Sequence, residues 1–204
     1  GVDGKDPQEG RVSRAETRRD REGVNPHRAD IRRPLSEGGL QHIAIEMIAK
    51  RLGVTKGSFY WHFESRDALI QSALELWESQ EQEQVFGKLD GLPDAQARLT
   101  ALVALVASEL KAHKIYSEML KTIDHPLVKP VLERVSKRRI DYLSASFRQA
   151  GMPRKQALNR ALLTYAAYVG FLQLNLQLGY PKLNHGEFDQ YIAHLTETLI
   201  PSSG

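Results

Sequence analysis

The sequence predicts an all-α protein with a small N-terminal unit and a larger C-terminal helical domain. Three observations support this fold class. Apolar residues recur three and four positions apart through most of the chain, alternating strand patterns are nearly missing, and glycines and prolines mark the ends of the apolar segments. The 204 residues are 41% hydrophobic, which is enough apolar material for a packed core.

Each predicted helix has its own start and stop signals. Thr55, Ser65 and Asp124 are suited to cap helix starts, and Gly53 and Gly151 to end helices in a left-handed conformation. A break is expected over residues 87–93, where two glycines and a proline gather. With a first helix near the N-terminus, about nine helices are expected. The others cover residues 43–52, 55–63, 65–84, 94–113, 116–122, 124–150, 154–178 and 187–199.

Composition and charge narrow the classes of function. Cysteine is absent, which excludes disulfides, thiolate metal sites and a cysteine nucleophile and fits a reducing compartment. No stretch of about 18 uninterrupted apolar residues and no leader-like segment is visible, so no membrane partner and a cytoplasmic location are expected. The net charge of +3 lies entirely before residue 67, with thirteen basic and ten acidic residues there, which suggests that this part meets a polyanion.

The first 24 residues are polar and mixed in charge, and they offer no apolar face to bury. We expect residues 1–24 to form a mobile arm. The arm either touches phosphates through its arginines or has no role.

A helix, a tight turn and a second short helix are predicted over residues 48–63, which is a helix-turn-helix layout. Ala49 is small enough for close helix approach, and Gly53 permits the turn. Thr55 caps the second helix and leaves its N-terminal amides facing outward. Gly57 and Ser58 are short, so a DNA backbone can approach. A packing module without DNA contact is the alternative.

The same stretch closely resembles the DNA-binding domain of the TetR family of transcriptional repressors. The resemblance rests on Ala49-Lys50-Arg51-Leu52-Gly53-Val54, on Thr55-Lys56-Gly57-Ser58-Phe59-Tyr60-Trp61-His62-Phe63, and on Ser65-Arg66-Asp67-Ala68-Leu69. The match extends over residues 38–70. It implies a DNA-binding domain over residues 25–70, with the helix-turn-helix at about 44–63, and an effector-binding and dimerisation domain over residues 71–204.

The resemblance also implies roles for single residues. Tyr60, His62, Thr55 and Arg66 correspond to phosphate contacts, and Lys56 is the best candidate for reading guanine. Trp61 either faces the groove or covers the domain's own core. The implied DNA-binding residues are Thr55, Lys56, Gly57, Ser58, Tyr60, Trp61, His62 and Arg66.

Two departures from the family pattern bear on DNA affinity. Ala44 stands where the family often has a capping Ser or Thr, which removes a cap worth about 1 kcal/mol. The expected first helix contains Pro34, and only Ile31 and Leu35 form an apolar pair there. We therefore hypothesise a weaker DNA affinity than that of a typical member.

The C-terminal domain is expected to dimerise and to bind a small molecule. Residues 157–172 are apolar nearly all round, which fits either a two-fold interface formed by the last two helices or a central helix of a monomer. Aromatic residues at helical spacing either line a pocket or form core. The pocket candidates are Trp77, Tyr116, Met119, Tyr142, Phe147, Tyr165, Tyr168, Phe171 and Gln173.

The favoured interpretation is a repressor that binds double-stranded operator DNA as a homodimer and is released by a small, largely apolar effector. The alternative is a helical ligand- or protein-binding dimer whose DNA binding is weakened by the atypical first helix. An enzyme is not expected, because no phosphate-binding loop, carboxylate pair or nucleophile elbow is present. No metal or cofactor is expected either, since the histidines lack zinc-ligand spacing.

Overall fold

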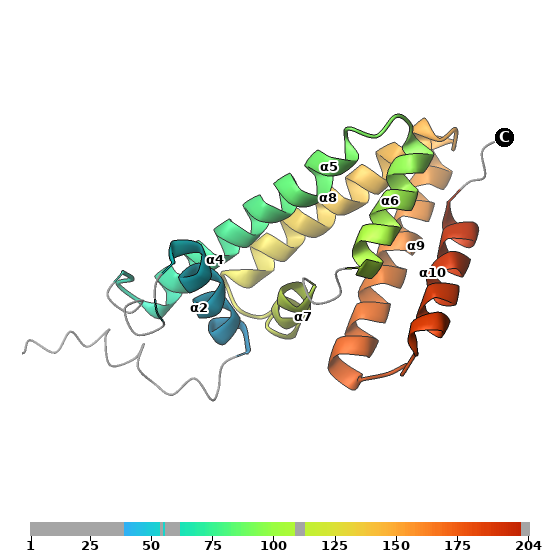
Figure 1. Ribbon diagram of the computed structural model, residues 1–204. Coiled ribbons are helices and arrows are strands. Elements are labelled where there is room, and N and C mark those ends of the chain that lie inside the picture. The colour runs from blue at the N-terminus through green and yellow to red at the C-terminus, as the bar shows by residue number, and fades with distance from the viewer. Residues whose placement is uncertain (1–38, 54, 56–61, 109–112, 201–204) are drawn as a thin grey trace, which may run out of the picture.

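The computed structural model describes residues 39–53, 55, 62–108 and 113–200, and these residues form helices, turns and bends without a strand. This confirms the all-α fold class. Helices of different length follow one another along an elongated molecule, with α2 at one end and α9 and α10 at the other (Figure 1). The elements are α2 (Gly39–Leu52), α4 (Arg66–Glu81), η2 (Gln82–Phe86), α5 (Gly87–Leu89), α6 (Ala95–Ser108), α7 (Lys114–Lys121), α8 (Val128–Gln149), α9 (Arg154–Gln173), η3 (Leu174–Leu178) and α10 (His185–Leu199).

The helix that leads from the N-terminal unit into the C-terminal domain is longer than expected. Ser65 caps α4 as predicted, because the Ala68 N–H donates to Ser65 Oγ at 3.1 Å. The π-helical turn η2 then continues α4 into α5. The expected break at residue 87 is therefore wrong: Gly87 has helical backbone angles (φ −59°, ψ −33°), and the helix ends only at Leu89. A glycine permits a break but does not impose one, and the buried Phe86 and Leu89 hold this turn against the domain.

The middle helices agree with the sequence in type but not in their limits. α6 begins after Asp94, whose Oδ1 accepts from the Ala97 N–H at 2.7 Å. α8 begins at Val128 instead of Asp124, because residues 122–127 form a series of turns with hydrogen bonds such as His125 N–H to the Thr122 carbonyl. Pro126 has no N–H to offer and belongs to these turns.

The last helices end where glycine permits a left-handed turn. Gly151 follows α8 with φ +98°, and Gly179 follows η3 with φ +63°. Asn184 begins α10 through a reciprocal cap with Glu187, which satisfies two backbone donors. These three limits were predicted within two residues.

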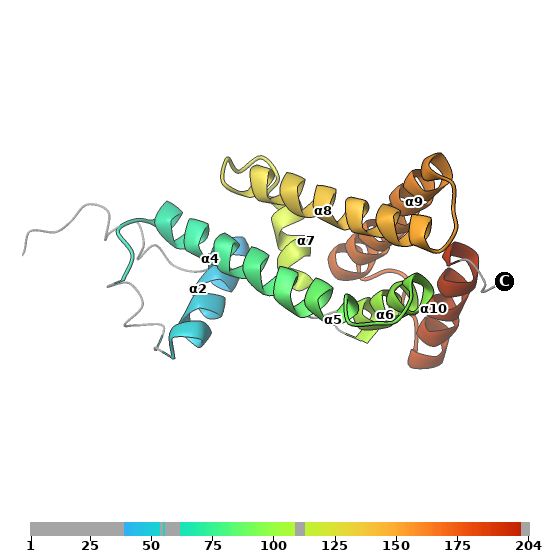
Figure 2. The same ribbon diagram turned by 90° about the horizontal axis from the view of Figure 1, so that it is seen from above.

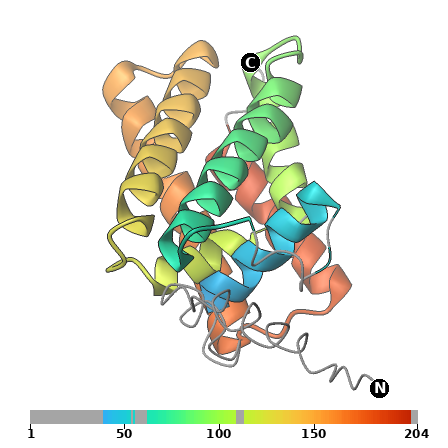
Figure 3. The ribbon, with the colours of Figure 1, turned by 90° about the vertical axis from the view of Figure 1, so that its left-hand side faces the viewer.

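Helices α4 and α8 run parallel to each other along the length of the molecule (Figures 2 and 3). Trp77 and Leu74 on α4 share one buried cluster with Val131 and Val135 on α8. The predicted inward residues of α4 are all buried, namely Leu69, Ile70, Ala73, Leu74 and Trp77. No helix among the described residues is long and apolar enough to span a membrane.

Candidate functional site

The frame of the helix-turn-helix is built by α2 and α4. Ile45 and Ala49 of α2 pack against Leu69 and Ala73 of α4, and Phe63 covers the edge of this cluster. Ala49 is 6% exposed, so the small side chain predicted there lies at the helix contact. Gly53 ends α2 with φ +64°, the conformation that the predicted turn requires.

Three of the predicted DNA-contacting residues lie in the described part of the chain. Thr55, His62 and Arg66 are all exposed, and Arg66 is the first residue of α4. A side chain must be exposed to contact DNA, but exposure alone does not identify a DNA-contacting residue. The remaining predicted contacts lie outside the described residues, namely Lys56, Gly57, Ser58, Tyr60 and Trp61. The first 24 residues and the expected first helix also lie outside them.

A cavity of about 320 Å³ lies in the C-terminal domain. Its wall takes residues from α4, η2, α5, α6, α7, α8, α9 and α10, so nearly every described element beyond α2 contributes to it. The wall contains seven of the nine pocket residues predicted from the sequence: Trp77, Tyr116, Tyr142, Phe147, Tyr165, Tyr168 and Phe171.

The other two predicted pocket residues lie elsewhere. Met119 is fully buried in the same core cluster as Leu40 of α2 and Val128 of α8, and it does not line the cavity. Gln173 uses its side-chain oxygen to accept a hydrogen bond from Ser117 Oγ at 2.8 Å, which joins α9 to α7. Neither residue lines the cavity.

Tyrosines and one histidine form the polar lining between α7 and α9. The Tyr165 hydroxyl bonds to those of Tyr116 and of Ser136, the latter at 2.9 Å. Burial, followed by the neighbouring Tyr165, raises the pKa of Tyr116, and burial raises the pKa of Tyr168 to about 12. Burial, reinforced by the Arg139 charge, lowers the pKa of His113 to about 4. At neutral pH the Tyr168 hydroxyl therefore shares a hydrogen bond with Nδ1 of an uncharged His113, at 2.7 Å.

A buried ion pair lies in the same wall. Arg139 of α8 donates through Nε to Glu81 Oε1 at 2.6 Å, and its Nη2 also contacts that oxygen. The side chains of Glu81 and Arg139 are only 8% and 14% exposed. The guanidinium carbon lies 4.4 Å from the ring centre of Tyr116 and 5.5 Å from that of Tyr168. The tyrosine faces thus add cation–π stabilisation to the pair.

Sequence reasoning missed the charged residues of this wall, Glu81, His113 and Arg139. Arg139 stands in the run Lys137-Arg138-Arg139, which is typical of a solvated helix face. A signal was nevertheless present, because position 139 continues the buried stripe of Val131 and Val135 at intervals of four. The apolar residues of α10 that line the cavity were also missed, since the cavity forms only when α10 covers α6 and α9.

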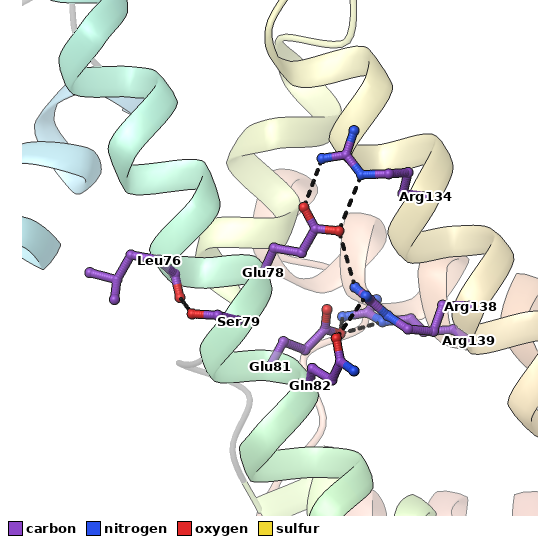
Figure 4. Close-up of polar contacts among 8 residues, drawn as sticks. All are labelled: Leu76, Glu78, Ser79, Glu81, Gln82, Arg134, Arg138 and Arg139. Carbon is purple, nitrogen blue, oxygen red and sulfur yellow. Dashed lines mark hydrogen bonds and ion pairs between the residues drawn. The ribbon is translucent and has the colours of Figure 1, made fainter.

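Charged residues extend the contact between α4 and α8 along both helices (Figure 4). Glu78 accepts from Arg134 at 2.7 Å and lies 3.4 Å from Arg138 Nη2. Gln82 accepts from Arg138 at 3.2 Å. Arginine charge and hydrogen bonding, led by Arg134, lower the pKa of Glu78, so this carboxylate stays ionised at neutral pH.

The α2 end of the molecule contacts the cavity domain through α7 as well. Leu40 of α2 belongs to the same buried cluster as Tyr116 and Met119 of α7. A Cβ added at Gly39 would lie 2.6 Å from a carboxylate oxygen of Glu118, so α2 approaches α7 closely there. Since Tyr116 also lines the cavity, α7 connects the cavity wall with the helix-turn-helix frame.

The described helices place the frame of a helix-turn-helix at one end of the chain and a cavity in its larger helical part. The model of the bacterial regulatory proteins of the tetR family matches residues 31–73, so this part of the chain is similar to the DNA-binding domain of TetR-family transcriptional regulators, which are DNA-binding regulators and not enzymes.

Two curated regulators are similar to the chain in sequence, and one solved structure is similar to it in fold. The HTH-type transcriptional regulator BetI of Klebsiella pneumoniae (strain 342) is 25% identical over 176 residues, which cover 82% of this chain and 89% of that protein. BetI of Escherichia coli (strain K12) is 24% identical over the same coverage. A crystal structure of a Rhodococcus sp. protein assigned to the TetR family is similar in fold, with a TM-score of 0.55 at 15% identity, over 86% of this chain and 98% of that one.

Proposed function

We propose that this regulator is a repressor that binds operator DNA as a homodimer and is released when a small, largely apolar effector fills the C-terminal cavity. One observation carries the proposal. The cavity wall includes residues of α4 and α7, and both of these helices pack against α2 of the helix-turn-helix frame. A molecule in the cavity therefore touches the helices that position the DNA-binding unit.

The proposed mechanism is a shift between two arrangements of α4. DNA selects the arrangement in which the two recognition helices of a dimer have the spacing of successive major grooves. An effector beside Trp77 and Glu81 favours another position of α4, because those side chains belong to both the cavity wall and the α4–α8 contact. Affinity for DNA then falls by the ratio of effector affinities for the two arrangements.

The dimer is supported by an exposed apolar surface on α9. Leu158, Leu162 and Leu163 are 45%, 46% and 57% exposed. Ala166 and Gly170 continue the same face at intervals of four, and a Cβ added at Gly170 would meet no atom within 4 Å. Such a leucine stripe beside small residues is suited to close packing against the same helix of a second copy.

The DNA contacts are proposed for the residues named from the family resemblance, with Lys56 reading a base and Tyr60, His62 and Arg66 holding phosphates. Phosphate contacts set position and salt dependence, and base contacts set sequence preference. Because its target is DNA, the proposed place of action is the cytoplasm.

The test is a fluorescence-anisotropy titration of the full chain against the DNA upstream of its own gene and against a scrambled duplex, at several salt concentrations. The proposal expects specific binding that weakens with salt. Lys56→Ala should reduce the preference for the specific duplex by about tenfold, the loss of about 1–3 kcal/mol that follows when one base contact is removed. Lys182→Ala, which removes an exposed lysine far from α4, is the matched control and should leave binding unchanged.

Equal binding to both duplexes at every salt concentration would contradict the repressor proposal. That result would favour the alternative of a helical ligand-binding dimer whose DNA affinity has been lost through the atypical first helix.

A further inference from the structure

The buried charges of the cavity wall form one neutral pair. Among the described lining residues, Arg139 and Glu81 make this pair, whereas Lys88 is a further cation that is exposed to solvent. His113 adds no charge at neutral pH, because burial and the nearby guanidinium keep its ring deprotonated. What the buried wall offers a ligand is therefore the remaining hydrogen-bonding capacity of its arginine.

The arginine also has a donor that no described residue uses. Glu81 Oε1 takes the N–H groups of Nε and Nη2, whereas Nη1 is buried and makes no hydrogen bond in the described part of the chain. A guanidinium has five N–H donors in a planar fork, and a buried donor without a partner is unfavourable. A carboxylate is the acceptor whose shape and charge suit such a fork.

Arg139 occupies the aromatic surface that a ligand of the opposite charge would need. Tyr116 and Tyr168 stack with their ring centres 6.1 Å apart, and the Arg139 guanidinium already lies against both of them. An organic cation in this aromatic surface would have to approach a fixed, buried cation without screening by water. The same surface that could hold an ammonium group therefore disfavours one.

The rest of the cavity wall is mainly apolar and is suited to the apolar part of a ligand. α6 contributes Leu102, Val103 and Val106, and Phe171 packs against Tyr191 of α10 with ring centres 4.7 Å apart. The volume of about 320 Å³ suits a molecule with one or two rings or a medium-length chain.

We propose that the effector is an amphipathic organic acid, with an apolar body held by α6 and α10 and a carboxylate that accepts hydrogen bonds from Arg139. The inference rests on the proposed function of the cavity as the effector site and names the chemical class of that effector. The unbonded Oε2 of Glu81 repels a carboxylate, and the Arg139 guanidinium that already holds Glu81 is the buried cation that offsets this repulsion. Because Glu81 lies on α4, an acid that shares Arg139 weakens the tie between α8 and α4.

The test compares matched probes by isothermal titration calorimetry at neutral pH, without DNA. The probes are phenylalkanoic acids of increasing chain length, their primary amides and the corresponding phenylalkyl-trimethylammonium ions. The best acid is expected to bind at least tenfold more tightly than its amide, and the ammonium ion more weakly than both. An amide that binds as tightly as its acid, a preference for the ammonium ion, or no binding of any acid overturns the assignment.

Variants of the ion pair test whether Arg139 causes the preference for acids. The double variant Glu81→Gln with Arg139→Gln replaces the ion pair by two neutral amides of similar shape. It should bind acid and amide within threefold of each other. Arg139→Lys keeps the charge and should keep part of the preference for acids. Arg134→Gln changes an exposed arginine of the same helix and should leave the preference unchanged. A double variant that folds, as judged by circular dichroism and melting temperature, and still prefers the acid tenfold contradicts the role of Arg139.

A second measurement separates this inference from the proposed function. The best probe of each class is added to the complex with DNA in the anisotropy assay. Release by the acid alone supports both proposals. Release by an amide or an ammonium ion overturns the acid assignment and leaves the effector mechanism standing. Tight acid binding that leaves DNA affinity unchanged supports the chemistry of the cavity and contradicts its regulatory role.

Discussion

At the scale of single residues, the unusual feature is a charged pair inside an apolar domain. Burying Glu81 and Arg139 removes both from water, and their attraction compensates only when their geometry and hydrogen bonds are good. Here the carboxylate bonds to two guanidinium nitrogens and the tyrosine faces cover the cation, yet one nitrogen and one oxygen remain unbonded. A bound ligand could supply the missing hydrogen bonds to these two atoms, whereas in a protein core nearly all buried polar atoms are already hydrogen-bonded.

His113 gives a pH dependence that belongs to this scale. Its pKa falls from 6.5 to about 4 in the folded protein, so the folded state binds its proton less well than the unfolded state. The contribution of the uncharged His113 to folding stability is fully present above pH 6.5 and is lost as the pH falls toward 4. At about 1.4 kcal/mol per pKa unit, this loss is on the order of 3 kcal/mol.

Urea unfolding of the wild type and of His113→Gln at a series of pH values measures this loss. The variant keeps an acceptor for Tyr168 but cannot titrate, so its stability should fall less between pH 6.5 and 4. His185→Gln changes a histidine whose side chain is 94% exposed and should retain the dependence of the wild type. Parallel pH curves for the wild type and His113→Gln would refute the assignment.

At the scale of the element, the start of α4 depends on one hydroxyl. Ser65 has an extended backbone and accepts from the Ala68 N–H, and Asp67 in the first turn favours the positive end of the helix. Ser65→Ala should lower the free energy of unfolding by about 1 kcal/mol, whereas Ser65→Asp should keep most of it. Thermal or urea unfolding checks this expectation.

The control for the cap is Ser79→Ala. Ser79 lies on the same helix and is exposed, and its hydroxyl donates only to the Leu76 carbonyl within the helix (Figure 4). It should change stability by a few tenths of a kcal/mol at most. An equal loss for both variants would show that the cap does not position α4.

Element limits show where local signals were decisive and where they were not. Gly151 and Gly179 end helices as expected, because each adopts a positive φ that other residues resist. Gly87 carries no such conformation and lies inside a continuous helix, since Phe86 and Leu89 gain more from burial than the glycine loses in entropy. Local propensity is a weak guide when neighbouring side chains can be buried.

At the scale of the whole molecule, the parallel pair α4 and α8 and the contact of α2 with α7 give two routes between the cavity and the helix-turn-helix frame. The salt bridges of Glu78 with Arg134 and Arg138 lie at the edge of the first route. Leu40 and Tyr116 in one buried cluster form the second. Both routes are made of packed side chains, which is the kind of contact that the proposed effector mechanism requires.

The proposed dimer is tested at this scale. Leu162→Glu combined with Leu163→Glu places two charges on the exposed face of α9 and should convert a dimer into a monomer without unfolding it, because neither side chain is buried. Light scattering coupled to gel filtration measures the mass. Lys129→Glu, on the exposed surface of α8, is the control and should remain dimeric. A wild type that is monomeric at micromolar concentration would contradict the dimer.

The sequence alone determined the helical class, the order of the helices, the helix-turn-helix segment and most aromatic residues of the cavity. These features depend on periodicity, capping residues and turn glycines, which act over a few neighbouring positions. Tertiary structure decided what those residues surround. Glu81 and Arg139 lie 58 positions apart and His113 and Tyr168 lie 55 apart, so only the packing of α4, α7, α8 and α9 brings each pair together. The buried ion pair of the cavity wall follows from that packing, because burial turns surface-like arginine and histidine side chains into groups whose charge and hydrogen bonds must be met inside the protein.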